Sequence, residues 1–167
     1  FRGTTNKLGG WKEDLNMSFM PTIPAQRRAL SYLTRQISRH PGTYYLTGHS
    51  KGGSLAIYAF DNLPQPLADQ VAHVYSFDGP SGVPLDPNHR DRVTKLVPQS
   101  SLIGVSLDPA TNFEVVKSHV KLFGQHDVLT WNIADHTFAR LPTTTWISRY
   151  FQKTFALWSA GLDTKAT

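Results

Sequence analysis

The 167-residue sequence contains no cysteine, which excludes disulfide bonds and thiolate metal sites. It also has no apolar run near the roughly 20 residues that a membrane-spanning helix requires, so we expect no transmembrane segment. Acidic residues are few, 12 against 17 Lys and Arg, and the formal net charge is +5. The basic residues are scattered and form no run interleaved with aromatic residues, as a nucleic-acid surface would. We therefore expect no nucleic-acid partner.

The remaining composition is that of a globular protein, with 40% hydrophobic and 17% charged residues. No repeat, linker or low-complexity segment divides the chain, so we expect one domain over residues 1–167. No signal peptide is visible, although this absence says little in a chain that opens on Phe1. We expect a cytoplasmic location. No group of residues has metal-ligand spacing, and we expect neither a metal nor an organic cofactor.

The apolar pattern predicts helices and strands in alternation. Helices are expected over 24–40, 52–63 and 143–158, because apolar residues recur at helical spacing. Strands are expected over 43–48, 71–77, parts of 95–107, and 113–123. This order predicts an α/β domain with a mostly parallel sheet flanked by helices.

The last predicted helix has two interpretations. Ile147, Phe151, Phe155 and Trp158 share one face, which favours a helix that covers the sheet. Arg149 and Lys153 lie on other faces and would suit peripheral contact with a lipid surface. Covering the sheet is the simpler prediction.

A serine framed by glycines stands between a predicted strand and a predicted helix, in "TYYLTGHSKGGSLAIYAF". The pattern G-x-S-x-G places a nucleophile on a strained strand-to-helix turn, where the backbone approaches itself too closely for larger residues. The start of the following helix then points its partial positive charge at a developing oxyanion. Ser50 is therefore the candidate nucleophile, against the alternative of a tight turn with an idle serine.

A serine needs a base, and the base needs an orienting acid. In a hydrolase sheet both follow the serine, on loops after later strands, in the order Ser, Asp or Glu, His. Among the histidines after Ser50, His126 follows a predicted strand directly, and we prefer it to His136 and then to His119, which falls within that strand. For the acid, Asp78 follows the strand over 71–77, and we prefer it to Asp108.

Several blocks resemble a known family. "GHSKGGSLA" is similar to the nucleophile region of class 3 lipases, and the opening "FRGT" resembles their oxyanion loop. With "GWKEDLNMSF", "VYSFDGPSG", "VPQSS" and "QHD", these blocks resemble an uncharacterised bacterial lipase-like family of the α/β-hydrolase superfamily, related to class 3 lipases. The resemblance spans residues 1 to about 131. It implies an α/β-hydrolase-like sheet that lacks its N-terminal strands, and hence a chain that is a fragment of a longer one.

The resemblance also assigns roles to residues. It implies that Ser50 is the nucleophile, that His126 is the histidine, and that the backbone amides of Lys51 and Thr4 form the oxyanion hole. It departs from class 3 lipases at "LVPQSSL", where those enzymes carry their acid and this chain has no carboxylate. Lys51 also replaces an apolar residue, and we expect its side chain to point to solvent rather than to hold an anionic substrate.

The sequence thus predicts a serine esterase that cleaves a small-molecule acyl ester through an acyl-enzyme on Ser50. The main alternative is a hydrolase-like domain without activity that serves as a binding or scaffold module. Acyl transfer to an alcohol or thiol, with the same triad, is a second alternative.

Overall fold

The computed structural model describes residue 1 and residues 22–80, 85–106 and 113–163, without the side chains of 159–163. In these ranges the chain forms a five-stranded sheet with strand order β1-β2-β3-β4-β7. The strands are β1 (Tyr44–His49), β2 (Val71–Phe77), β3 (Val93–Pro98), β4 (Glu114–Val116) and β7 (Arg140–Leu141). The first four are parallel and β7 is antiparallel. The predicted mixed α/β fold with a mostly parallel sheet is therefore confirmed.

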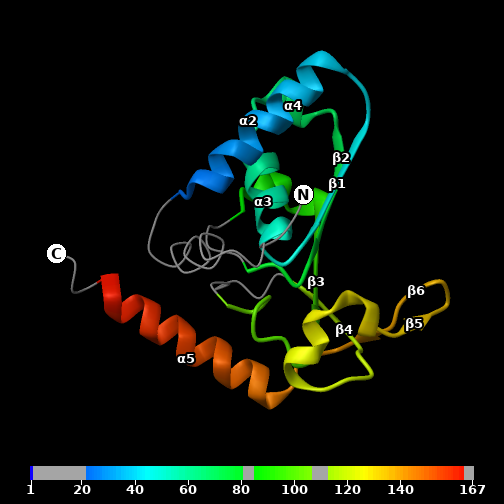
Figure 1. The fold of residues 1–167 in the computed structure, drawn as a ribbon, viewed down its shortest axis with the longest axis vertical. Coiled ribbons are helices and arrows are strands. Elements are labelled where there is room, and N and C mark those ends of the chain that lie inside the picture. Colours follow the sequence, from blue (N-terminus) through cyan, green and yellow to red (C-terminus); the bar gives the residue numbers. More distant parts are fainter. Residues whose placement is uncertain (2–21, 81–84, 107–112, 164–167) are drawn as a thin grey trace.

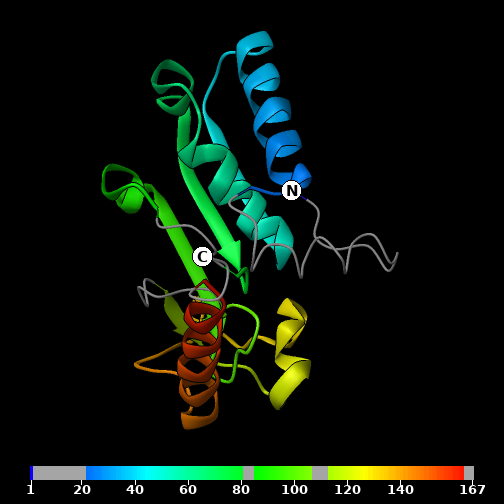
Figure 2. The same ribbon diagram turned by 90° about the vertical axis from the view of Figure 1, so that its left-hand side faces the viewer.

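Two of the predicted helices, α2 (Pro24–Arg39) and α3 (Lys51–Asp61), pack side by side, and α3 lies against β1 and β2 (Figures 1 and 2). In α2, Pro24 occupies the first turn, where its missing N–H costs nothing, and Ala29, Leu33 and Ile37 are buried at a spacing of four. A short helix α4 (Gln65–Ala68) leads into β2.

The core beside these helices is formed by aliphatic residues of α2, α3, α4, β1 and β2 together with the fully buried Phe60. Smaller clusters continue it along β3 and β4. Leu96 packs with Val116 and Trp131, whereas Val97, the next residue, packs with Val105 and Val115. Successive residues of β3 thus serve different clusters, because side chains alternate across a strand.

Two predicted strands are shorter than expected. The segment 101–106 contains no strand and forms turns after β3. The strand predicted over 113–123 ends at Val116, and the chain continues through the 3₁₀ helices η2 (Leu122–His126) and η3 (Val128–Thr130). His119 consequently lies outside any strand, and its side chain is exposed. Val105 in the first segment is buried without belonging to a strand, whereas Leu122 and Phe123 in the second are exposed. A run of apolar residues alone does not distinguish such loops from a strand.

The remaining elements lie outside the main sheet. Strands β5 (Ile133–Ala134) and β6 (Thr137–Phe138) form a separate hairpin, and the 3₁₀ helix η1 (Pro87–Arg92) precedes β3. Helix α5 (Trp146–Asp163) extends away from the sheet (Figure 1). Within the described ranges, no helix is both long and apolar enough to cross a bilayer.

Candidate active site

The turn between β1 and α3 holds Ser50 in a strained conformation. Its backbone has φ 55° and ψ −133°, a region that residues with a side chain rarely adopt. Ser50 caps α3, and its carbonyl accepts hydrogen bonds from the amides of Gly53 and Ser54. The positive end of the α3 dipole is therefore directed at the position that Ser50 occupies.

Glycines permit this turn through close backbone contacts. A Cβ atom on Gly48 would overlap the carbonyl group of Gly52, so no larger residue fits there without a backbone shift. The turn also packs against the segment after β2, because a Cβ atom on Gly79 would come within 2.8 Å of the Ser50 carbonyl oxygen. The Ser50 amide donates to the Phe77 carbonyl at 2.8 Å. The ends of β1 and β2 are thereby joined beside the serine.

Asp78 follows β2 directly and lies at this same end of the sheet. It also has a positive φ, 47°, and its side chain is almost fully buried. A buried carboxylate requires hydrogen-bond donors to remain ionised, and Asp78 has three. Ser101 Oγ donates to Oδ1 at 2.5 Å, the Gly104 amide donates to Oδ1 at 3.0 Å, and His126 Nδ1 lies 2.7 Å from Oδ2.

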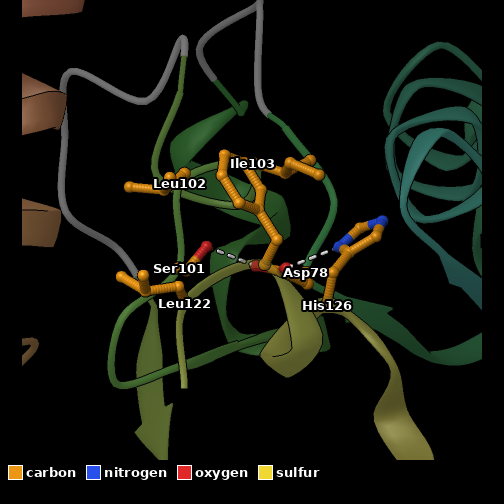
Figure 3. Close-up of a pocket in the computed structure, with 7 residues that line it drawn as sticks. Asp78, Ser101, Leu102, Ile103, Leu122 and His126 are labelled. Atoms are coloured by element: carbon orange, nitrogen blue, oxygen red, sulfur yellow. Dashed lines mark hydrogen bonds and ion pairs between the residues drawn. The ribbon is translucent and has the colours of Figure 1, made fainter. Parts of the chain in front are cut away.

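The structure brings the predicted base and the preferred acid together (Figure 3). His126 ends η2, and about a quarter of its side chain is exposed, against almost none of Asp78. Because the carboxylate oxygen accepts, Nδ1 of His126 carries the proton. In the neutral ring, Nε2 is then the unprotonated nitrogen. This tautomer is the one that a general base paired with a carboxylate requires.

The loop after β3 supports the carboxylate. Ser101 Oγ accepts from the Gly104 amide at 2.9 Å while it donates to Asp78. The carbonyl of Ser101 in turn accepts from Ser148 Oγ of α5 at 2.5 Å. Ser101 belongs to "LVPQSSL", the segment that lacks the expected carboxylate. There, a serine supports an acid supplied by the neighbouring strand.

A second network anchors the loop that carries His126. Gln125 is buried, its Oε1 accepts from the Ser100 amide at 2.8 Å, and its Nε2 donates to the Val120 carbonyl at 2.7 Å. Trp131 Nε1 donates to the Gln125 carbonyl at 2.7 Å. These contacts fix η2 to the end of β3 and so anchor the segment that carries His126.

The residue before Ser50, His49, contacts His126, whereas Ser50 itself is not hydrogen-bonded to His126 in the described part of the chain. The ring of His49, the residue before Ser50, lies against the ring of His126, with centroids 4.4 Å apart. Among the described residues, no hydrogen bond joins the Ser50 hydroxyl to His126. Catalytic hydrogen bonds of this kind often tighten only when substrate binds.

The other predicted residues have different outcomes. His136 lies in the exposed turn of the β5–β6 hairpin. Thr4 and Asp108 lie outside the described residues. The expected exposure of the Lys51 side chain is wrong: Lys51 is buried, because the whole first turn of α3 is enclosed. Its backbone amide lies at the start of α3, as an oxyanion donor requires.

A small pocket, partly open to solvent, adjoins the Asp78–His126 pair. Its lining combines these two residues with Ser101, with Leu102 and Ile103 of the loop after β3, and with Leu122 of η2 (Figure 3). Phe123 of η2 also lines it. The Phe123 side chain is largely exposed. The pocket therefore offers an apolar surface next to the imidazole.

Fold and site together define an α/β protein with a mostly parallel sheet and a serine, histidine and aspartate gathered at the carboxyl ends of its strands. The family model described as Mbeg1-like matches residues 1–167, and the chain belongs to this family. No curated protein and no solved structure matches the chain.

Sequence reasoning did not identify Ser101, Gln125 or His49 as parts of the site. Ser101 and Gln125 act through contacts between loops that are far apart in sequence, and no motif marks them. The adjacency of His49 to the candidate nucleophile was the only available signal.

Proposed function

We propose that this protein is a serine hydrolase of the α/β-hydrolase type that cleaves carboxylic esters through an acyl-enzyme on Ser50. The observation that carries the proposal is the Asp78–His126 pair at 2.7 Å, beside a serine in a strained strand-to-helix turn. A tight turn alone needs no buried carboxylate, and a carboxylate–imidazole pair alone needs no strained serine. Their combination is typical of nucleophilic catalysis.

In the proposed reaction, His126 Nε2 takes the hydroxyl proton as Ser50 Oγ attacks the acyl carbonyl carbon. The ester C–O bond then breaks, and the imidazolium returns the proton to the leaving alcohol. Asp78 stabilises the imidazolium between these steps. A water molecule, deprotonated by His126, hydrolyses the acyl-enzyme and restores Ser50.

The oxyanion would be held by the backbone amides of Lys51 and Thr4. Lys51 is the first residue of α3, and the helix start favours negative charge. Thr4 is outside the described residues, and of the block "FRGT" the structure describes Phe1 alone. The amino nitrogen of Phe1 lies 2.6 Å from the Thr47 carbonyl oxygen, three residues before the serine. Loss of one such donor lowers turnover by about 100- to 1000-fold.

The test is labelling of the purified protein by a fluorophosphonate probe, which reacts with an activated serine. We expect wild type to be labelled and Ser50→Ala not to be. His126→Asn should lose labelling, whereas His136→Asn, a matched change in an exposed turn, should retain it. Asparagine tolerates the positive φ of residue 136. Absence of labelling in the folded wild type would instead support a binding or scaffold module.

Hydrolysis and acyl transfer use the same residues and differ in the acceptor. We propose water as the acceptor, because the Asp78–His126 pair adjoins a pocket that is open to solvent. Product analysis with and without an added alcohol distinguishes the two reactions. Transfer predicts a new ester in proportion to the alcohol, at the expense of free acid.

A second proposal concerns α5, which we propose makes peripheral contact with an anionic lipid surface. Trp146, Tyr150 and Leu157 are each about two-thirds exposed, and their spacing of four and seven residues places them on one helical face. Arg149 and Lys153 are also exposed, and residues 146–158 include no acidic residue. Amphipathic aromatic residues with neighbouring cations suit a membrane interface.

The predicted covering of the sheet applies to only part of this helix. Phe151 packs against the Val97 cluster, and Phe155 and Trp158 continue from it as a chain of aromatic contacts. Trp158 is half-exposed. Near its start, α5 therefore packs one face against the protein through Phe151. A different face carries the exposed Trp146 and Tyr150.

A further inference from the structure

His49 makes two contacts with His126, across 77 residues of sequence. Its Nε2 lies 2.7 Å from the backbone carbonyl oxygen of His126. Its ring also lies against the His126 ring, with centroids 4.4 Å apart and planes inclined by 41°. A carbonyl oxygen can only accept, so His49 Nε2 carries a proton and donates it. One side chain thus holds the backbone of His126 and covers a face of its ring.

Among the described residues, these contacts add to the restraints that Asp78 and Gln125 place on His126. Asp78 holds the His126 ring at one atom, Nδ1, which leaves the ring free to swing about that hydrogen bond. Gln125 fixes η2 from the side of β3, but nothing in that network touches the ring. His49 acts from the opposite side, at the end of β1, and its ring contact limits the swing.

The position of His49 in the chain makes this restraint relevant to the nucleophile. His49 is the last residue of β1, and its peptide bond leads directly into the strained Ser50. The end of β1 therefore both leads into Ser50 and holds His126 through the side chain of His49. Any movement of η2 away from the serine must first break the His49–His126 hydrogen bond.

We infer that His49 is a positioning residue that sets the place of His126 relative to Ser50. The inference rests on the proposed function of Ser50 and His126 and assigns His49 no contact with the reacting atoms. Misplacement of a catalytic group by about 1 Å costs up to about 100-fold in rate. Loss of the His49 contacts should therefore slow the chemical step without weakening the binding of substrate.

The test compares three variants of His49 by the kinetics of fluorophosphonate labelling. For each variant, the maximal labelling rate and the half-saturating probe concentration are measured. His49→Phe keeps a ring but loses the donor, His49→Ala loses both, and His49→Gln retains an amide N–H within similar reach. We expect His49→Phe and His49→Ala to lower the maximal rate by about 10- to 100-fold, with the half-saturating concentration unchanged. His49→Gln should recover most of the loss.

His73 provides a matched control. It is also a strand histidine. Its ring lies against the Tyr75 ring, with centroids 4.6 Å apart, and its Nε2 lies 2.8 Å from Thr94 Oγ1. Within the part of the chain that the structure describes, no hydrogen bond or ring contact joins it to the site. His73→Phe should leave the maximal labelling rate unchanged. The thermal midpoint of each variant separates a loss of folded protein from a loss of rate.

The outcomes separate the inference from the proposed function. Wild-type labelling that depends on Ser50, combined with unchanged rates in all three His49 variants, would overturn the inference alone. Absence of Ser50-dependent labelling in wild type would overturn the proposed function and the inference with it.

The proton NMR signal of the His126 ring gives a readout besides reactivity. We expect it to shift in His49→Ala, because a ring at 4.4 Å contributes a ring current, and an unchanged signal would contradict the His49 ring contact.

Discussion

The two carboxylate oxygens of Asp78 have different partners: one binds His126, and the other binds the loop after β3. Oδ2 accepts from His126 Nδ1 at 2.7 Å, while Oδ1 accepts from Ser101 Oγ and the Gly104 amide. The carboxylate therefore cannot rotate toward or away from the imidazole without losing a hydrogen bond on its other side. Such two-sided support is what holds an orienting acid in one geometry.

The first prediction concerns the identity of the acid. Asp78→Asn should lower the labelling rate, and any esterase turnover, by about 10³- to 10⁴-fold, because an amide can donate to Nδ1 and favour the wrong tautomer of His126. The measurement is the labelling rate of the folded variant. Asp108→Asn, which changes the alternative acid, should label at the wild-type rate. The reverse pattern would assign the role to Asp108.

The second prediction concerns the support of the acid. Ser101→Ala removes a hydrogen bond to a charged, buried group, which is worth about 1.5–3 kcal/mol, and should lower both the free energy of unfolding and the labelling rate. The measurements are denaturant unfolding and labelling. Ser106→Ala is the control, because Ser106 Oγ bonds the Ile103 carbonyl in the same loop at 2.6 Å without touching Asp78. Equal labelling rates in the two variants would show that the Ser101 contact is only structural.

The third prediction concerns the backbone approach at the serine. Gly48→Ala places a Cβ atom on the carbonyl of Gly52, so the turn must open and the free energy of unfolding should fall by at least about 1–3 kcal/mol. Labelling of the folded fraction should also fall, because Ser50 moves with the turn. Gly42→Ala, where an added Cβ meets nothing within 4 Å, should be close to neutral in urea denaturation. A Gly48→Ala protein as stable as Gly42→Ala would refute the close packing of this turn.

The fourth prediction concerns α5. Tyr150→Ser should weaken cosedimentation with vesicles of phosphatidylcholine and phosphatidylglycerol, whereas Tyr45→Ser should not. Both tyrosines are 68% exposed, but Tyr45 lies on β1. Lys153→Gln should lower binding by a further few-fold, since a cation near an anionic surface is worth about 1 kcal/mol. Binding that is equally strong to pure phosphatidylcholine vesicles would argue against the charge-dependent contact.

The amino-acid sequence determined the elements whose pattern is local. The apolar spacing of residues 24–39, the β-branched run of β2 and the glycines around Ser50 each encode a helix, a strand or a turn by short-range sterics. For this reason α2, β2 and the strand-to-helix turn were predicted closely. The order of strands and helices also implied a mostly parallel sheet, because parallel strands need helical crossovers.

Only the tertiary structure decided which distant side chains meet. The sequence left Asp78 and Asp108 as alternatives for the acid and could not assign a role to Ser101, because hydrogen bonds between loops depend on where β2 and β3 end in space. Burial of Lys51 and exposure of Trp146 were likewise undetermined by their neighbours in sequence. These properties follow from the packing of whole elements, which the pattern of any single segment does not contain.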